Sequence, residues 1–249
     1  MKNHRAWLGA AVFATTLLAG LPARADEVVA DLSNHLIAIN SSFTGTSVVL
    51  FGATDGPGDI VAVVRGPEHE VTVWRKAKVL GIWANAEAVE FANVPSFYAV
   101  AASRPIEDVV PASMAALYKI GVGNLKFEPK SAIAPSRLVI FTEALVRQQQ
   151  HAGLFPTRAD PVSFLGERLF RANIAFPANV PTGTYLVEVF LIRNREVVGA
   201  QTTPLIVSKV GVDAAVFNFA SGEAAAYGAI AVVMAVVAGW LASLPFRSI

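Results

Sequence analysis

The hydrophobic positions divide the chain into a long middle part with mostly alternating polarity and an uninterrupted apolar run near each end. Short apolar runs at 36–40, 46–53, 60–66, 70–76, 79–83, 88–91 and 97–102 are separated by segments rich in Gly, Pro and Asp. Strand-sized runs spaced about ten residues apart are typical of a sandwich or barrel rather than of βαβ units. This part of the chain therefore predicts a mainly β domain.

The β pattern is interrupted between residues 105 and 155. Residues 106–120 predict one or two helical turns and then a short helix. Pro135 suits the first position of a longer helix, and Gly153 suits its end. Four apolar residues share one face of that helix: Leu138, Phe141, Ala144 and Leu145. We therefore expect a helical insertion at about residues 105–155.

Alternation returns at 168–176 and 185–192, and the turn "RNRE" predicts a hairpin whose return strand is an edge at Pro204. The stretch from Pro181 to Tyr185 resembles the segment before the penultimate strand of immunoglobulin-like and fibronectin-like sandwiches. There a Tyr packs at a corner and its hydroxyl reaches nearby backbone; an ordinary turn is the alternative. We expect one immunoglobulin-like β-sandwich over residues 26–208 that carries the helical insertion.

The apolar run near the end of the sequence predicts a transmembrane helix at 224–244. Its 21 residues contain neither charge nor proline, with Glu223 before them and Arg247 after them. A helix of this length spans about 31 Å, close to the thickness of the bilayer core. Tyr227 and Trp240 lie near opposite ends, where aromatic rings favour the headgroup layer. The alternative is a buried core helix, which usually has a polar stripe.

The other apolar run, at residues 6–21, predicts a signal peptide over residues 1–25. Lys2 and Arg5 precede the run, and the triplet Ala23-Arg24-Ala25 provides small residues two apart for cleavage after Ala25. Retention as a second helix is the alternative. After cleavage, we expect a single-pass protein of the bacterial inner membrane. Residues 26–208 then form its periplasmic domain, residues 209–223 are a linker to the span, and residues 245–249 are a cytoplasmic tail.

Composition narrows the possible classes of site. The chain has no cysteine, which excludes disulfides, thiolate zinc sites and cysteine nucleophiles. Its 20 basic and 19 acidic residues include no basic block, so we expect no nucleic-acid partner.

No motif nominates a catalytic, cofactor or metal residue. Three histidines remain after signal cleavage, at His35, His69 and His151, and they lie far apart in the sequence. His69 stands between Glu68 and Glu70, but a solvated turn explains this group better than a closed metal site does. No nucleophile elbow, P-loop or dinucleotide fingerprint is present. We expect no cofactor and no enzymatic activity.

Two groups of residues are candidates for interaction. Trp74 and Trp83 flank the basic step that begins at Arg75, and Trp and Arg are enriched in interface cores. Alternatively, Trp74 faces inward on a strand while the cations solvate a loop. The second group is a stripe of small residues that would let another helix approach the predicted span, although such a stripe arises easily by chance: Ala231, Ala235, Gly239 and Ser243.

The layout as a whole resembles a family of alphaproteobacterial transmembrane proteins. The resemblance covers the signal peptide, "FTGTSVVLFGA", "PTGTYLVEVFLI" and the single C-terminal span. No activity is established for that family, and it supplies no catalytic residue. Its genes neighbour those of sulfite-exporter-type permeases, so the resemblance implies a transport-associated role.

These expectations favour a membrane-anchored periplasmic binding or accessory subunit. Its expected partners are the lipid bilayer and an inner-membrane protein, and the resemblance implies a transporter such as a sulfite-exporter-type permease. Two alternatives remain open: a periplasmic enzyme whose active site is assembled from residues distant in sequence, and a structural protein of the envelope.

Overall fold

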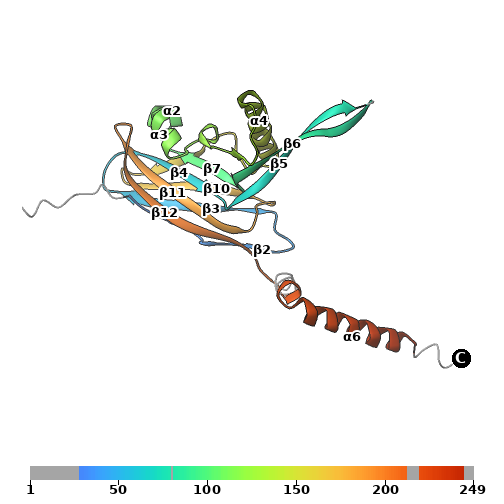
Figure 1. Ribbon diagram of the computed structural model, residues 1–249. Helices are drawn as coiled ribbons and strands as arrows, with labels where there is room; N and C mark the ends of the chain where they lie inside the picture. The colour runs from blue at the N-terminus through green and yellow to red at the C-terminus, as the bar shows by residue number, and fades with distance from the viewer. Residues whose placement is uncertain (1–27, 80, 212–218, 244–249) are drawn as a thin grey trace, which may run out of the picture.

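The computed structural model describes residues 28–79, 81–211 and 219–243 (Figure 1). The expected signal peptide at 1–25 and the expected tail at 245–249 lie outside the described residues. The last residue of the expected span, at position 244, does so too.

Most strands belong to one curled sheet, which confirms the prediction of a mainly β domain. The strand order is β1-β3-β10-β9-β7-β4-β11-β12-β2. Neighbouring strands are antiparallel except for the pairs β2–β12 and β7–β9, which are parallel. The strands are β1 (Val28–Leu32), β2 (Leu36–Ile39), β3 (Gly45–Thr54), β4 (Asp59–Arg65), β7 (Tyr98–Ala102), β9 (Asp160–Leu165), β10 (Leu169–Pro177), β11 (Gly183–Arg193) and β12 (Glu196–Lys209).

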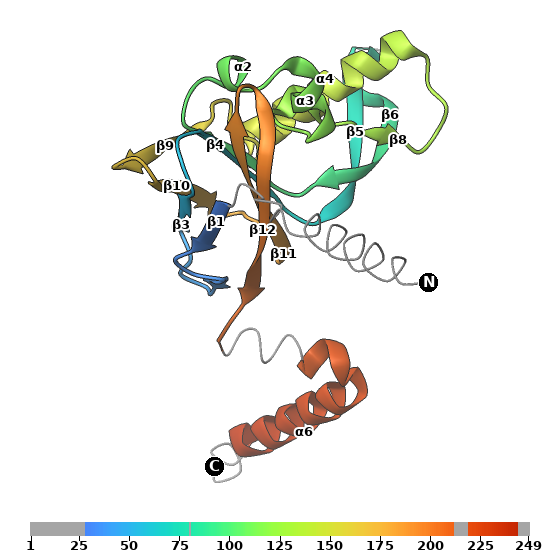
Figure 2. The ribbon, with the colours of Figure 1, turned by 90° about the vertical axis from the view of Figure 1, so that its left-hand side faces the viewer.

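The curl brings strands β1, β3, β10 and β9 over strands β2, β12, β11, β4 and β7, with an apolar core between them. Leu50, Phe170 and Val189 are buried there, each from a different strand. Along these strands buried and exposed residues alternate, because successive side chains point to opposite faces of a sheet. The side-chain amide of Gln201 on β12 both donates to and accepts from the backbone of Ala30 on β1, at 2.8 Å each. Figure 2 shows β12 passing beside β1.

The helical insertion lies where the sequence predicts it. It contains α2 (Ile106–Val109), α3 (Ala112–Leu117), the 3₁₀ turn η1 (Val122–Asn124) and α4 (Pro135–His151). These elements cover the outer face of β4, β7 and β11, so that Val63, Val100 and Phe190 are buried against them. Strand β4 is therefore buried on both faces, which explains its continuous apolar sequence "IVAVV".

Two long strands leave the curled sheet as a projecting hairpin (Figure 1). Strands β5 (Glu68–Val79) and β6 (Ile82–Pro95), with the short β8 (Glu128–Pro129), form a separate three-stranded sheet. The prediction that these segments belong to the sandwich is wrong, as is a separate strand at 79–83, where the chain turns at Gly81 (φ 88°). Beyond the pair Val73–Val89, the described side chains on both faces of the hairpin are largely exposed, so this part has no core to join.

Two buried tyrosines fix the loops at the edges of the domain. The Tyr185 hydroxyl donates a 2.6 Å hydrogen bond to the Pro181 carbonyl oxygen, which confirms the contact expected of this residue. The Tyr98 hydroxyl donates to the Lys119 carbonyl oxygen at 2.8 Å and accepts from the Gly121 N–H at 2.7 Å. Tyr98 thus ties the insertion between α3 and α4 to strand β7.

The last described element is α6 (Ala224–Ser243), which stands apart from the sheets in Figures 1 and 2. Residues 219–222 are also helical, so the expected linker at 209–223 is not wholly irregular. Among the residues that the structure describes, no helix combines the length and apolar character needed to cross a membrane.

Candidate functional site

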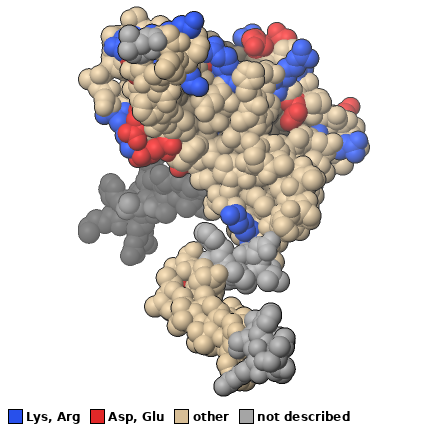
Figure 3. All heavy atoms as spheres, turned by 90° about the vertical axis from the view of Figure 1, so that its right-hand side faces the viewer, with Lys and Arg blue, Asp and Glu red and all other residues tan. Residues whose placement is uncertain are grey.

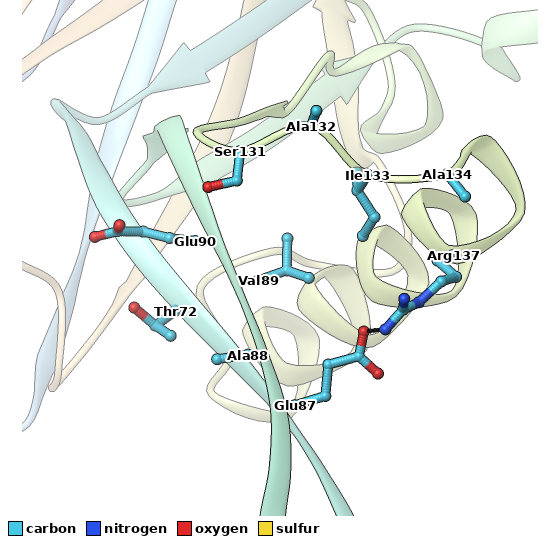
Figure 4. A pocket seen from close by; sticks show the side chains of 10 residues that line it. All are labelled: Thr72, Glu87, Ala88, Val89, Glu90, Ser131, Ala132, Ile133, Ala134 and Arg137. Carbon is cyan, nitrogen blue, oxygen red and sulfur yellow. Dashed lines mark ion pairs between the residues drawn. The ribbon is translucent and has the colours of Figure 1, made fainter.

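A polar cleft lies at the base of the hairpin, between β6 and the segment that leads into α4. Its volume is about 500 Å³. Figure 4 shows Glu87 and Glu90 of β6 on one side and Ser131 and Arg137 on the other. This hollow has carboxylates near a hydroxyl group, so it is a natural place to look for acid–base chemistry.

The charged groups around this cleft are already paired with one another. Glu87 accepts a hydrogen bond from Arg75 Nε at 3.1 Å and forms an ion pair with Arg137 of α4. Lys130 Nζ lies 2.5 Å from Glu70 and 3.3 Å from Glu90, one on each strand of the hairpin. These contacts fasten the hairpin to the helical insertion. The expectation that the chain is not an enzyme stays a prediction.

The hairpin brings together the interaction residues named from the sequence. Trp74 and Arg75 lie on β5 and Trp83 lies on β6, paired with Lys78 across the hairpin. The Lys78 Nζ is 5.7 Å from the centre of the Trp83 ring. Trp74 is 55% exposed, so the alternative in which it faces inward is wrong, and the cations stand on a strand rather than in a loop.

An apolar groove of about 530 Å³ lies on the outer face of β1, β3, β10 and β9. The strand registers place Val29, Ala53, Leu169 and Leu165 in one row across all four strands. In the next row, Phe51 stands between Asp31 of β1 and Arg171 of β10. Four large apolar side chains of the groove are each about half exposed: Val29, Phe51, Leu165 and Leu169.

The close packing beneath the groove depends on Gly52. A Cβ at this position would lie 2.4 Å from the carbonyl oxygen of Val29 and 2.5 Å from Cζ of Phe170. The missing side chain lets the Phe170 ring fill the core directly under the groove. Sequence reasoning missed this surface, because its members come from four strands and only the register aligns them. The one available signal was the apolar outward position on each strand.

The histidines stay separate in the fold. His35 Nε2 lies 2.8 Å from Asp31 Oδ1, while His69 is on β5 and His151 is at the end of α4. Within the described parts of the chain, no group of three or more His, Asp or Glu side chains could hold a metal ion.

The stripe of small residues named from the sequence lies on α6. Ala231, Ala235 and Gly239 follow one another by about one helical turn, and each is exposed. The side chain of Ser243, the fourth member, lies outside the described residues. The structure brings no other described helix to this stripe.

Comparison with known proteins places the chain at the level of a family. Residues 27–248 match the family model described as "Putative transmembrane protein (Alph_Pro_TM)". No curated protein matches the chain.

Proposed function

The chain belongs to this family of transmembrane proteins, and on that premise we propose that it is a membrane-anchored accessory subunit. In this proposal its β domain binds a membrane protein through the outer-face groove. We further propose that this membrane protein is a transporter, such as a sulfite-exporter-type permease. This part of the proposal rests on the family resemblance described above.

The groove is the observation that carries the proposal. Contiguous exposed apolar surface is uncommon on soluble monomers and marks interaction sites when it is concentrated in one place. Here the row that contains Ala53 and Leu169 forms such a surface on an otherwise regular sheet face. None of these side chains contributes to either buried cluster, so the fold itself does not require them to be apolar.

The lining of the groove indicates the chemistry of its occupant. It contains one carboxylate, Asp31, and one guanidinium, Arg171, on opposite sides of Phe51. Asp31 already contacts His35, so an occupant has to be apolar in the middle and able to pair with the guanidinium of Arg171 at one side. A hydrophobic segment with polar ends, as at the boundary of a membrane protein, meets both conditions.

The proposed topology places this domain in the periplasm, with a single span at 224–244 in the inner membrane. The run of 21 uncharged residues supports a span. Helix α6 covers all but the last residue of that run and, within the described residues, does not by itself reach the length and apolar character of a span, so the proposed span rests on the sequence run. The signal-like segment at 1–25 supports export of residues 26–208.

We also propose that the domain is an immunoglobulin-like sandwich. The two halves of the curled sheet, β1-β3-β10-β9 and β2-β12-β11-β4-β7, support this assignment because they match the ABED and GFC arrangement of such folds. The hydrogen bond from Tyr185 to Pro181 at the start of the penultimate strand supports it further.

Site-specific photocrosslinking in intact membranes tests the accessory role. A photoreactive phenylalanine replaces Leu169 in the groove, and the matched control carries it at Leu117, which is 69% exposed on α3. We expect the Leu169 probe to crosslink to one integral membrane protein and the Leu117 probe to give no such product. A Phe51→Asp substitution should abolish the product, because burying an unpaired carboxylate in an apolar contact is costly.

Folding of the Phe51→Asp variant is checked by its far-UV circular dichroism and its urea midpoint. If the folded Leu169 probe reacts only with lipid, or gives the same product as the Leu117 probe, the groove does not bind a membrane-protein partner.

A further inference from the structure

The outer part of the hairpin, at the described residues 74–79 and 81–86, has a composition that folding does not explain. We call this part the hairpin tip. Ile82 and Trp83 are 72% and 64% exposed, and neither belongs to a buried cluster. Water-exposed aromatic and aliphatic side chains at the end of a projecting arm cost solubility and return no core stability. A contact outside the domain would take both side chains out of water.

All charges in the hairpin tip have the same sign. Residues 74–86 contain Arg75, Lys76 and Lys78 and no carboxylate. Glu87, just below the tip, takes part in the ion pairs with Arg75 and Arg137. Among the described residues, Lys76 and Lys78 form no ion pair. Blue Lys and Arg atoms gather around the end of the hairpin in Figure 3.

The tip combines cations and indole rings on one face. Strand alternation puts Trp74, Lys76 and Lys78 on the same side of β5. Trp83 is the cross-strand partner of Lys78, and the 5.7 Å between the Lys78 Nζ and the Trp83 ring places them on that side too. This face therefore offers two indole rings and two ammonium groups to one surface.

Indole rings and lysines together fit the boundary between a bilayer and water. Trp favours the headgroup layer, and Lys can bury its aliphatic stem while its ammonium group stays among phosphates. A lysine near an anionic lipid surface strengthens binding of the protein to that surface. Because salt screens the charges, this attraction decays over about one Debye length. A protein partner would more often be met by charges of both signs, as in the groove.

We propose that the hairpin tip binds anionic phospholipid headgroups, and so holds the domain against the bilayer at a second point beside its anchor. The occupant is a lipid surface rather than a second protein. The uniform charge of the tip complements phosphate, and the exposed Ile82 and Trp83 supply the apolar contact that shallow insertion needs. This inference concerns a surface separate from the groove and does not require the groove to have a partner.

Tryptophan fluorescence of the full chain in lipid nanodiscs tests the proposal. Replacing Trp7, Trp74 and Trp240 by Phe leaves Trp83 as the reporter. We expect the Trp83 emission to shift to the blue, and to be quenched by lipids brominated near the headgroup, in discs with phosphatidylglycerol. Discs of phosphatidylcholine alone should produce neither effect, and 1 M salt should reverse both.

The decisive variant is Lys76→Glu with Lys78→Glu, and the matched control is Lys126→Glu, an exposed lysine on another surface. The double variant should lose the blue shift and the quenching, while the control should keep both. Circular dichroism and the urea midpoint verify that the double variant folds. Two results would overturn the proposal: equal Trp83 emission in both kinds of disc, or a blue shift that is already present in detergent, without lipid discs, because Trp83 contacts another protein.

Neither result bears on crosslinking from Leu169, so failure of this proposal is distinguishable from failure of the accessory role.

Discussion

The hydroxyl of Tyr185 lies 2.6 Å from the carbonyl oxygen of Pro181, four residues earlier, and donates a hydrogen bond to it from inside the core. Burial raises the pKa of Tyr185, so the phenol stays protonated and able to donate at all physiological pH values. The contact fixes the path by which the chain enters β11, the strand that touches both β4 and β12.

Replacing Tyr185 by Phe should lower the free energy of unfolding by about 1 kcal/mol, because it removes one hydrogen bond and leaves a carbonyl without its partner. Tyr98→Phe should cost more, since the Tyr98 hydroxyl makes two such bonds. Urea unfolding measures both. Tyr118→Phe is the control: its ring packs on Phe190 and no hydrogen bond of its hydroxyl is among those of the described residues. Equal losses in all three variants would contradict this account.

Gly52→Ala should be strongly destabilising, by about 3 kcal/mol, because the new methyl group meets the rigid carbonyl of Val29 as well as the Phe170 ring. Thermal unfolding measures the loss. Gly123→Ala is the matched control, since a Cβ there meets no atom within 4 Å. If Gly52→Ala has the same midpoint as Gly123→Ala, the packing beneath the groove is looser than described.

Glu87→Gln should loosen the hairpin from α4, because Arg75 and Arg137 then lose their shared carboxylate. Pairs of this kind contribute up to about 1 kcal/mol, so the whole domain should remain folded. Hydrogen exchange should become faster in β6 around residues 84–90 and stay unchanged in β10. Glu128→Gln, an exposed carboxylate of β8 with no ion pair among the described residues, serves as the control. Unchanged exchange in β6 would show that the cleft contacts do not hold the hairpin.

Acid should weaken the domain partly through Asp59. The Arg104 side chain, which hydrogen-bonds to this carboxylate with its Nε at 2.9 Å, lowers the pKa of Asp59. A pKa that is lower in the folded state gives stability that is present above the unfolded value of about 3.9 and lost as the pH falls through the folded value. Asp59→Asn should therefore flatten the fall of the urea midpoint as the pH drops below about 4.

Asp160 has a pKa shift in the opposite direction to that of Asp59, so its substitution should change the pH dependence of stability in the opposite direction. Burial raises the pKa of Asp160, so its effect favours the folded state at low pH and is lost as the pH rises through the folded value. Asp160→Asn should make the acid-induced loss of stability steeper. A flatter profile for Asp160→Asn would contradict these assignments.

The proposed span makes a prediction for the membrane fraction. The wild-type chain should stay in the pellet after alkaline carbonate extraction. Val233→Arg with Val237→Arg should release it, because each Arg near the centre of a span costs about 3 kcal/mol on insertion. Replacing Ala225 and Ala226 by Ser instead should leave the pellet fraction unchanged. Release of the wild-type chain by carbonate would exclude the span.

Local signals in the sequence predicted the helical insertion well. Pro135 begins α4 and Gly153, with φ 71°, follows its end. Phe141 and Leu145 are buried as their spacing predicts. These features succeed because capping, periodicity and turn conformation each depend on residues within a few positions of one another.

Local signals could not predict the hairpin or the groove, for a different reason in each case. A single Gly at position 81 is a weak turn signal, and Ile82 and Trp83 belong to an apolar run of strand length although they face water. The groove depends on pairings such as Ala53 with Leu169, which are far apart in the sequence. Register over that distance is decided by the packing of the whole sheet.

The amide of Gln201 occupies the place that a further strand would take beside Ala30. The outermost strand of a sheet offers unpaired N–H and C=O groups on which another chain can grow an intermolecular ladder, and a side chain that satisfies both groups blocks such growth. At this edge the amide of Gln201 therefore shields the domain against self-association. Deamidation of Gln201 to Glu would leave a carboxylate that can accept the Ala30 N–H but, when ionised, cannot donate to the Ala30 carbonyl oxygen.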